Sequence, residues 1–227
     1  MKNRVVYIIL TGIVVGFSSC KSQDSIYEEY LVPNGLFYPG QAMNAVAKPG
    51  DGRIELTWQK GSDPKVVKAS IFWNNYTRSV DVDISPDMDI VSHIIDPIAE
   101  NMYSFMIHTY DADGNTSIPV EVMGRVYGNL YRSTLTNRVL KNTVYDGLDM
   151  TLNWAESGVG ETGINLNYTD IHDNEQSGEV FPSETTTVLN DYNPAKPLVY
   201  FTSYKPDSLA IDVFHAPTIE ILIDTEK

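Results

Sequence analysis

The chain of 227 residues contains a single cysteine, Cys20, and so cannot form an internal disulfide. Its fold must be held by packing and hydrogen bonds, even in a compartment that permits disulfides. Long apolar runs are missing as well. The stretch from Val5 to Phe17 is thirteen residues long, whereas a membrane-spanning helix needs about 20.

Basic residues are scarce, with 16 Lys and Arg against 30 Asp and Glu and a formal net charge of −14. Residues 1–19 hold two basic residues and no acidic one, so the chain without them carries −16. Nucleic-acid affinity comes from neutralising phosphates with Lys and Arg, and docking on anionic membranes also uses basic clusters. We therefore expect no nucleic-acid partner.

Familiar catalytic motifs are absent from the sequence. It has no His-Glu-x-x-His string to hold a metal and no Gly-x-Ser-x-Gly string to present a nucleophile. A catalytic site needs partners that converge on its histidines, and the four histidines here are scattered: His93, His108, His172 and His215. We predict that the protein is not an enzyme and uses no cofactor, and that His108 points outward from its strand.

The N-terminus has the order of features that is typical of a secretory signal peptide. These features are Lys2, Arg4, the apolar run and the small pair Ser18-Ser19. The string Phe17-Ser-Ser-Cys20 resembles a lipobox, which implies cleavage before Cys20 and a diacylated cysteine. We predict a signal peptide at 1–19 and a membrane anchor on Cys20. The alternative is a spare thiol behind an ordinary signal peptide.

Residues 20–39 are predicted to be a polar tether. Its acidic residues are Asp24, Glu28 and Glu29. Surface lipoproteins of gut Bacteroidota resemble one another in carrying acidic residues behind the cysteine, which implies an outer-membrane location on the cell surface, with the periplasmic face as the alternative. Asp24-Ser25-Ile26 and Asp207-Ser208-Leu209 resemble the O-glycosylation acceptor of this group, which implies modification of Ser25 and Ser208, or a tight turn at the second.

The remainder of the chain repeats one unit. In each half, three apolar residues alternate with polar ones, as on a strand with one buried face. The two sets are Ile54, Leu56 and Trp58, and Met150, Leu152 and Trp154. A second strand is expected at 69–73 and at 163–168. Phe105 and Phe201 each follow their tryptophan by 47 residues, so we expect them to be equivalent.

Turn signals separate the short alternating runs, and no long window has helical periodicity. Strands at this spacing predict an all-β chain of two tandem β-sandwiches, each of about 100 residues. We place the first sandwich at 40–126 and the second at 129–223.

The first unit resembles a fibronectin type III module on two counts. Trp58 fits the tryptophan of the second strand, and Tyr103-Ser-Phe105-Met-Ile107 fits the Tyr-x-Phe-x-aliphatic run of the sixth. In the second unit Val199 replaces that tyrosine, or the register shifts by two if Tyr204 matches Tyr110. The second unit is therefore expected to be a related, immunoglobulin-like sandwich.

Six strings spread over the chain resemble an uncharacterised family of Bacteroidota outer-membrane lipoproteins, a domain of unknown function. They are Tyr30-Leu31, Tyr38-Pro-Gly40, Ile71-Phe-Trp-Asn-Asn75, Gly124-Arg-Val-Tyr-Gly128, Asn137-Arg138 and Tyr204-Lys-Pro-Asp-Ser-Leu-Ala-Ile-Asp212-Val-Phe214. The resemblance implies no established activity.

One acidic loop has the spacing of a metal site. Asp111, Asp113 and Asn115 match the first three ligands of a calcium loop. Val122, however, stands where the bidentate Glu is required, and Gly114 in the same string suits a hairpin turn. We interpret the loop as a turn, with calcium binding as the alternative.

A candidate carbohydrate-binding edge consists of Phe72, Trp73, Asn74, Asn75 and Tyr76. Aromatic rings stack on sugar faces and amides bond hydroxyls, so these residue types suit a glycan. Trp73 alternates with apolar residues, and a tryptophan in that position typically packs in the core. Phe72 and Tyr76 are therefore the better candidates.

Taken together, the sequence favours a non-enzymatic, membrane-anchored surface lipoprotein with an adhesive or scaffold role linked to glycan handling. Its expected partners are the membrane and either glycans or other surface proteins. Two alternatives stay open. A cluster of exposed aromatic side chains favours a direct carbohydrate-binding lipoprotein of a polysaccharide-utilisation system, and a deep pocket with convergent carboxylates favours a hydrolase accessory protein.

Overall fold

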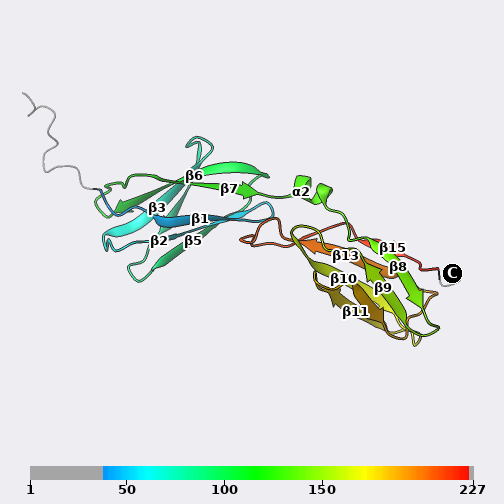
Figure 1. Ribbon diagram of the computed structural model, residues 1–227. Coiled ribbons are helices and arrows are strands. Elements are labelled where there is room, and N and C mark those ends of the chain that lie inside the picture. The colour runs from blue at the N-terminus through cyan, green and yellow to red at the C-terminus, as the bar shows by residue number, and fades with distance from the viewer. Residues whose placement is uncertain (1–37, 225–227) are drawn as a thin grey trace, which may run out of the picture. The chain divides into compact units, whose positions relative to one another are not determined.

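The computed structural model describes residues 38–224. In this range the chain forms fifteen strands and one short helix (Figure 1), which confirms the prediction of an all-β chain of tandem sandwiches. The predicted signal peptide, Cys20, Ser25 and nearly all of the predicted tether lie outside these residues. No helix within the described range has the length and apolar character that a membrane crossing requires.

The first sandwich consists of a three-stranded and a four-stranded antiparallel sheet. The smaller sheet has the order β1-β2-β5, with bounds Met43–Pro49, Ile54–Gln59 and Ile90–Ile95. The larger has the order β4-β3-β6-β7, with bounds Arg78–Asp83, Val66–Trp73, Asn101–Asp111 and Val120–Val126. One buried apolar cluster draws its residues from both sheets.

Tyr103, near the start of β6, is tied back to the preceding segment through its hydroxyl. Its ring is nearly buried, and its hydroxyl donates a hydrogen bond to the carbonyl oxygen of Ala99 at 2.9 Å. A tyrosine that reaches back to the backbone at this corner is a hallmark of immunoglobulin-like sandwiches. The Tyr-x-Phe-x-aliphatic run therefore marks the start of a core strand and the tyrosine that fastens it.

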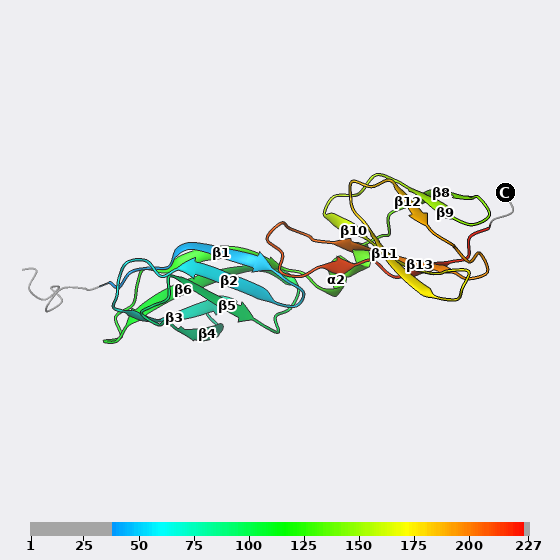
Figure 2. The ribbon, with the colours of Figure 1, turned by 90° about the horizontal axis from the view of Figure 1, so that it is seen from below.

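The second sandwich repeats this strand order. Its smaller sheet is β12-β9-β8, with bounds Thr186–Leu189, Met150–Trp154 and Leu140–Tyr145. Its larger sheet is β11-β10-β13, with bounds Glu175–Val180, Glu161–Thr169 and Leu198–Tyr204. Both β14 (Phe214–His215) and β15 (Ile219–Ile221) pair with β13. Figure 2 shows β8, β9 and β12 in a layer apart from β10, β11 and β13. The repeat is confirmed, with its last strand split in two.

Trp58 on β2 and Trp154 on β9 are each 1% exposed and lie in the two cores, as predicted. The predicted equivalence of Phe105 and Phe201 is wrong. Phe105 is fully buried, whereas Phe201 is half-buried outside the core, and the ring of its neighbour Tyr200 packs 5.2 Å from that of Trp154. Since side chains alternate along a strand, a spacing that differs by one residue moves a ring to the other face.

Helix α2 (Asn129–Thr134), between the sandwiches in sequence, was not predicted. The Glu100 carboxylate accepts hydrogen bonds from the backbone N–H groups of Leu130 and Tyr131, at 2.7 and 2.8 Å. A helix of six residues is too short to be stable alone. It forms here because a residue thirty positions earlier satisfies the N–H groups of its first turn.

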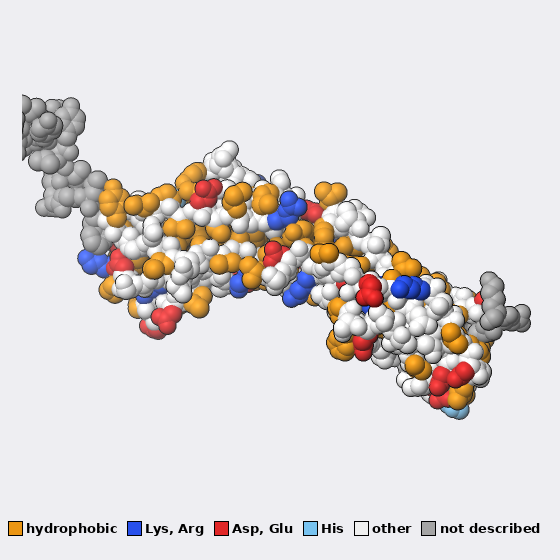
Figure 3. Space-filling view, viewed as in Figure 1, with side chains coloured by type: hydrophobic (Ala, Val, Ile, Leu, Met, Phe, Trp, Pro, Cys, Tyr) orange, Lys and Arg blue, Asp and Glu red, His pale blue; other side chains and the backbone are white. Residues whose placement is uncertain are grey.

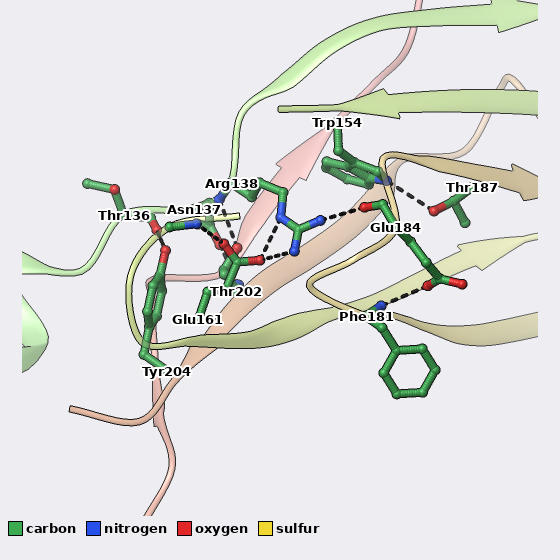
Figure 4. Close-up of polar contacts among 11 residues, drawn as sticks. Thr136, Asn137, Arg138, Trp154, Glu161, Phe181, Glu184, Thr187, Thr202 and Tyr204 are labelled. Carbon is green, nitrogen blue, oxygen red and sulfur yellow. Dashed lines mark hydrogen bonds and ion pairs between the residues drawn. The ribbon is translucent and has the colours of Figure 1, made fainter. Parts of the chain in front are cut away.

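The segment before β8 is fastened to the second sandwich through Asn137 (Figure 4). The backbone N–H of Thr202 donates to Asn137 Oδ1 at 2.6 Å, and Asn137 Nδ2 donates to the carbonyl oxygen of Pro217 at 2.6 Å. Pro217 follows β14 and has no N–H of its own. The side-chain amide of Asn137 therefore bridges β13 and the segment after β14 with two hydrogen bonds, at the point where the last strand is split.

The loop between β13 and β14 contacts the first sandwich. The Asp212 carboxylate accepts hydrogen bonds from Arg53 Nε and from the backbone N–H of Asp51, both at 2.9 Å. The two sandwiches thus belong to one compact unit, which begins at Pro39.

Candidate functional site

The outer face of the four-stranded sheet carries three mutually contacting rings, Phe72, Tyr76 and His108, which we call the aromatic patch. Phe72 on β3 and His108 on β6 alternate with core residues and so point away from the core. Ring centroids are 5.0 Å apart for Phe72 and Tyr76, and 5.4 Å apart for Phe72 and His108. The Tyr76 hydroxyl lies 3.3 Å from His108 Nε2. Tyr76 is 51% exposed, so the patch is open to solvent.

The turn between β3 and β4 holds Tyr76 in an uncommon backbone conformation. Asn74, Asn75 and Tyr76 have φ angles of 52°, 53° and 63°, and this left-handed region is disfavoured for a bulky side chain. The N–H and the hydroxyl of Thr77 both donate to the Asn74 carbonyl oxygen and close the turn. Strain of this kind costs about 1–3 kcal/mol and concentrates at functional sites.

Polar side chains border the patch along β3 and β4. Asp81 accepts hydrogen bonds from Ser70 Oγ at 2.6 Å and from Lys68 Nζ at 3.1 Å. The bond from Ser70 is the main cause that lowers the pKa of Asp81. Burial lowers the pKa of His108, so its ring is neutral at pH 7 and has one donor and one acceptor nitrogen. This border offers donors and acceptors to a hydroxyl-rich ligand.

The five residues of the predicted carbohydrate-binding edge divide between two faces. Phe72 and Tyr76 lie in the patch, and Asn74 and Asn75 are exposed at the turn. Trp73 must be removed from the set, because its side chain packs against the core, with its ring 6.4 Å from that of Phe105.

His108 faces outward as predicted, but no functional role was predicted for it. It joins the patch because β3 pairs with β6, which places His108 opposite Ser70 and next to Phe72. Its alternation with the core residues of β6 was the only signal in the sequence, and that signal does not identify the neighbouring strand.

Methionines extend the apolar surface beyond the patch along β6 and β7. Met106 is the register partner of Phe72, and Met102 and Met123 are 47% and 65% exposed. Several groups of hydrophobic side chains lie on the visible surface of the first sandwich (Figure 3).

The acidic loop is a hairpin turn between β6 and β7. Asp111 Oδ1 accepts from the backbone N–H groups of Asp113 and Asn115, at 3.1 and 2.9 Å, and Oδ2 accepts from Asn115 Nδ2 at 2.8 Å. Gly114 has a φ of 85°, which a turn of this kind requires. Within residues 38–224, no three His, Cys, Asp or Glu side chains are grouped to hold a metal ion.

Ser208 lies in a tight turn, in which the N–H of Leu209 donates to Asp207 Oδ1 at 2.7 Å. The turn explains the Asp-Ser-Leu string, and glycosylation of the exposed Ser208 stays a prediction.

Carboxylates also converge where the loop between β13 and β14 contacts the first sandwich. Asp51, Asp96 and Asp212 line a shallow hollow of about 260 Å³ together with Arg53. Arg53 pairs with Asp212, and Arg132 pairs with Asp51. Asp51 and Asp212 are committed to ion pairs and the hollow is shallow, so it does not resemble the deep pocket expected of a hydrolase accessory.

A buried ion pair joins Arg138 and Glu161 in the second sandwich (Figure 4). Arg138 Nε donates to Glu161 Oε1 at 2.6 Å, and Nη1 donates to the carbonyl oxygen of Glu184 at 2.8 Å. The other Glu161 oxygen accepts from the N–H of Gly158 at 3.0 Å. Both side chains are occupied by contacts within the protein, so we assign the pair a structural role.

One family model and two solved structures resemble this chain. The model of the DUF4998 family, described as a domain of unknown function, matches residues 20–214. A crystal structure of the chicken CNTN1 FN1–FN3 domains is 14% identical, with 85% of this chain and 70% of that chain covered and a TM-score of 0.40. A two fibronectin type III domain segment from chicken tenascin is 13% identical, with 82% and 100% covered and a TM-score of 0.33. No curated protein matches the chain.

Proposed function

Because the chain belongs to the DUF4998 family, whose description assigns no function, we propose from its own residues that it is a non-catalytic binding module with an adhesive or scaffold role. The ligand we propose for the aromatic patch is an uncharged glycan. We further propose that a lipid on Cys20 anchors the protein to the outer membrane, on the cell-surface side. Support for the anchor comes from the lipobox-like string and the apolar run before it.

The observation that carries the glycan proposal is the strained turn that places Tyr76 against Phe72 and His108. A solvated loop has no structural need to hold a tyrosine at positive φ, and a ring fixed in advance loses little conformational entropy when a ligand stacks on it. Exposed aromatic rings that cluster in this way are typical of binding surfaces.

The chemistry around the rings favours an uncharged ligand over an anionic one. Asp81 and Asp83 lie on the outer face of β4, and the chain as a whole carries a net charge of −14. Such a field repels polyanions. The neutral His108 ring and the Tyr76 hydroxyl offer hydrogen bonds to sugar hydroxyls without requiring a ligand charge.

A protein partner is the second candidate, and the exposed Met102 and Met123 favour it. Flexible thioether side chains adapt to varied apolar surfaces and recur at promiscuous protein-binding faces. The two candidates differ in the residues that they need, because a glycan depends on the rings and a protein would also cover the methionines.

The test is retardation of the full chain in native gels that contain soluble xylan, mannan or β-glucan. Wild type is expected to be retarded by at least one of them, and the Phe72→Ala/Tyr76→Ala variant to be retarded far less than wild type. Phe181→Ala is the matched control, since Phe181 is 55% exposed but lies away from the patch, after β11. Equal retardation of the patch variant and wild type would refute the proposal. A Met102→Ala/Met123→Ala variant with normal retardation separates the glycan from the protein candidate.

A further inference from the structure

The equivalent face of the second sandwich has a groove of its own. It opens on β10, β11 and β13, the strands that correspond to β3, β4 and β6, and has a volume of about 550 Å³. That size suits a small ligand or a few units of a chain. The side chains that matter for recognition are Asn167, Thr169, Glu175, Ser177, Pro197 and Val199.

Strand register arranges these side chains in rows across the sheet. Asn167 on β10 is the register partner of Ser177 on β11 and of Val199 on β13. The row therefore presents an amide, a hydroxyl and an apolar group side by side, with neighbouring strands about 4.8 Å apart. In the described part of the chain, the side chains of Asn167 and Ser177 form no hydrogen bond, so both are available to a ligand.

The next row holds a ring pair that parallels the aromatic patch. Phe201 lies opposite Asn165, and its ring meets that of His215 edge-on at 4.9 Å. In the first sandwich, Phe72 meets His108 edge-on at 5.4 Å. Both sandwiches thus carry a phenylalanine–histidine pair on the outer face of the same sheet.

We propose that this groove is a second site for the same uncharged, hydroxyl-rich glycan chain, an inference that rests on the function proposed above. Free amide and hydroxyl groups both donate and accept, as sugar hydroxyls require. Pro197 and Val199 line the groove and supply apolar contact for the C–H faces of the sugars, and Phe201 lies in the row beside them. No Lys or Arg lines the groove, and Glu175 does, which disfavours an anionic ligand.

Two sites on one chain make binding depend on polymer length. Once a polysaccharide occupies one site, the second binding event is intramolecular, and avidity then exceeds the affinity of either site by about a hundredfold or more. A hexasaccharide that occupies one site at a time gains nothing from the second. The polymer is therefore expected to bind far more tightly than its own hexasaccharide.

The experiment compares four full-length proteins on the same xylan, mannan and β-glucan and on their hexasaccharides. They are wild type, Asn167→Ala/Ser177→Ala, Phe72→Ala/Tyr76→Ala and the combined variant, with Asn142→Ala on the exposed β8 as the matched amide control. Each pair of substitutions is expected to cut polymer affinity about a hundredfold, the combination to abolish binding, and the control to change nothing. In ¹⁵N NMR of wild type, a hexasaccharide is expected to shift the Asn167 side-chain amide, a measurement that needs no variant to fold.

The possible failures are distinguishable. If the groove variant binds like wild type and the Asn167 signal does not move, the groove is not a binding site. In that case the patch proposal still holds, provided that the patch variant loses binding. If only the groove variant loses binding, the patch proposal fails and the groove stands. If wild type binds none of the polysaccharides, both proposals are overturned.

Discussion

Arg138 and Glu161 form an ion pair in which both side chains are 1% exposed. Arg138 lies in the segment before β8, and Glu161 begins β10, so the pair links a connecting segment to the larger sheet of the second sandwich. Each charge has left water and relies on the other for compensation. The segment between the sandwiches is thereby an integral part of the second one.

Replacing Arg138 alone is expected to be costly. Arg138→Ala leaves the Glu161 carboxylate buried without its partner and should lower the free energy of unfolding by about 3–5 kcal/mol. The paired change Arg138→Met/Glu161→Leu removes both charges and should restore most of that loss. Urea denaturation measures both, with the exposed Arg78→Ala as control. A double variant as unstable as the single one would contradict the role of the charges.

Replacing Tyr76 is expected to change glycan binding while leaving thermal stability nearly unchanged. Tyr76→Gly removes the ring but accepts the positive φ, so relief of about 1–3 kcal/mol of strain offsets the greater flexibility of glycine, about 0.5–1 kcal/mol. We expect thermal stability close to wild type and loss of glycan retardation. Tyr76→Phe keeps the ring and should still bind. Binding by the glycine variant would show that the strained turn serves some other purpose.

Asp170 gives the second sandwich a defined acid response. Burial alone would raise its pKa, but hydrogen bonds from Asn174, Gln176 and His172 outweigh burial and lower the pKa to about 2. A carboxylate with a depressed pKa in the folded state stabilises the fold above its unfolded pKa of about 3.9. That contribution is lost as the pH falls from about 4 to about 2. Asp170→Asn should therefore be less stable at pH 7 and respond less to acid in this window.

The measurement is the urea midpoint as a function of pH. Asp173→Asn is the matched control, because Asp173 is an exposed residue of the same turn. An Asp170→Asn profile that falls as steeply as that of wild type would rule out this carboxylate as the source.

Calcium should not change the melting temperature of the protein if Asp111, Asp113 and Asn115 form only a turn. A ligand at a hundredfold excess over its Kd adds about 2.7 kcal/mol to stability, which raises the melting temperature of a domain of this size by several degrees. We expect identical melting curves with millimolar calcium and with chelator. A calcium-dependent rise that Asp113→Ala removes would instead establish a metal site.

The lipid anchor is tested at Cys20. Cys20→Ala should abolish incorporation of labelled palmitate and leave the apolar N-terminal run uncut, because the thioether has lost its only sulfur. Mass spectrometry of wild type should show a diacylated N-terminus at this residue. An unmodified cysteine in membrane-derived protein would favour the spare-thiol alternative.

The alternation of apolar and polar residues predicted those features of the fold that involve a single strand. The alternation ending at Trp58 and Trp154 identified two core strands, and the Tyr103 run identified a third. Such patterns follow from the pleat itself, so they can be detected without knowledge of the partner strand. The hydrogen bonds of the loop at Asp111 are local in the same way, since they all stay within five residues.

Features that depend on pairing between distant segments could not be predicted from the sequence. The cap of α2 comes from Glu100, and the patch requires Phe72 on β3 beside His108 on β6. The predicted equivalence of Phe201 and Phe105 was wrong for a similar reason. Spacing along the chain does not determine which face of a sheet a residue occupies once a loop differs in length.

The bridge that Asn137 makes between Thr202 and Pro217 determines where this protein can be divided. A fragment that begins at Leu140 would contain every strand of the second sandwich, yet its sheet would have a gap at one edge. Expression trials of the second half should therefore start upstream of Thr136. Truncation at the strand boundary would yield a fragment prone to self-association, because an unsatisfied sheet edge is a template for another chain.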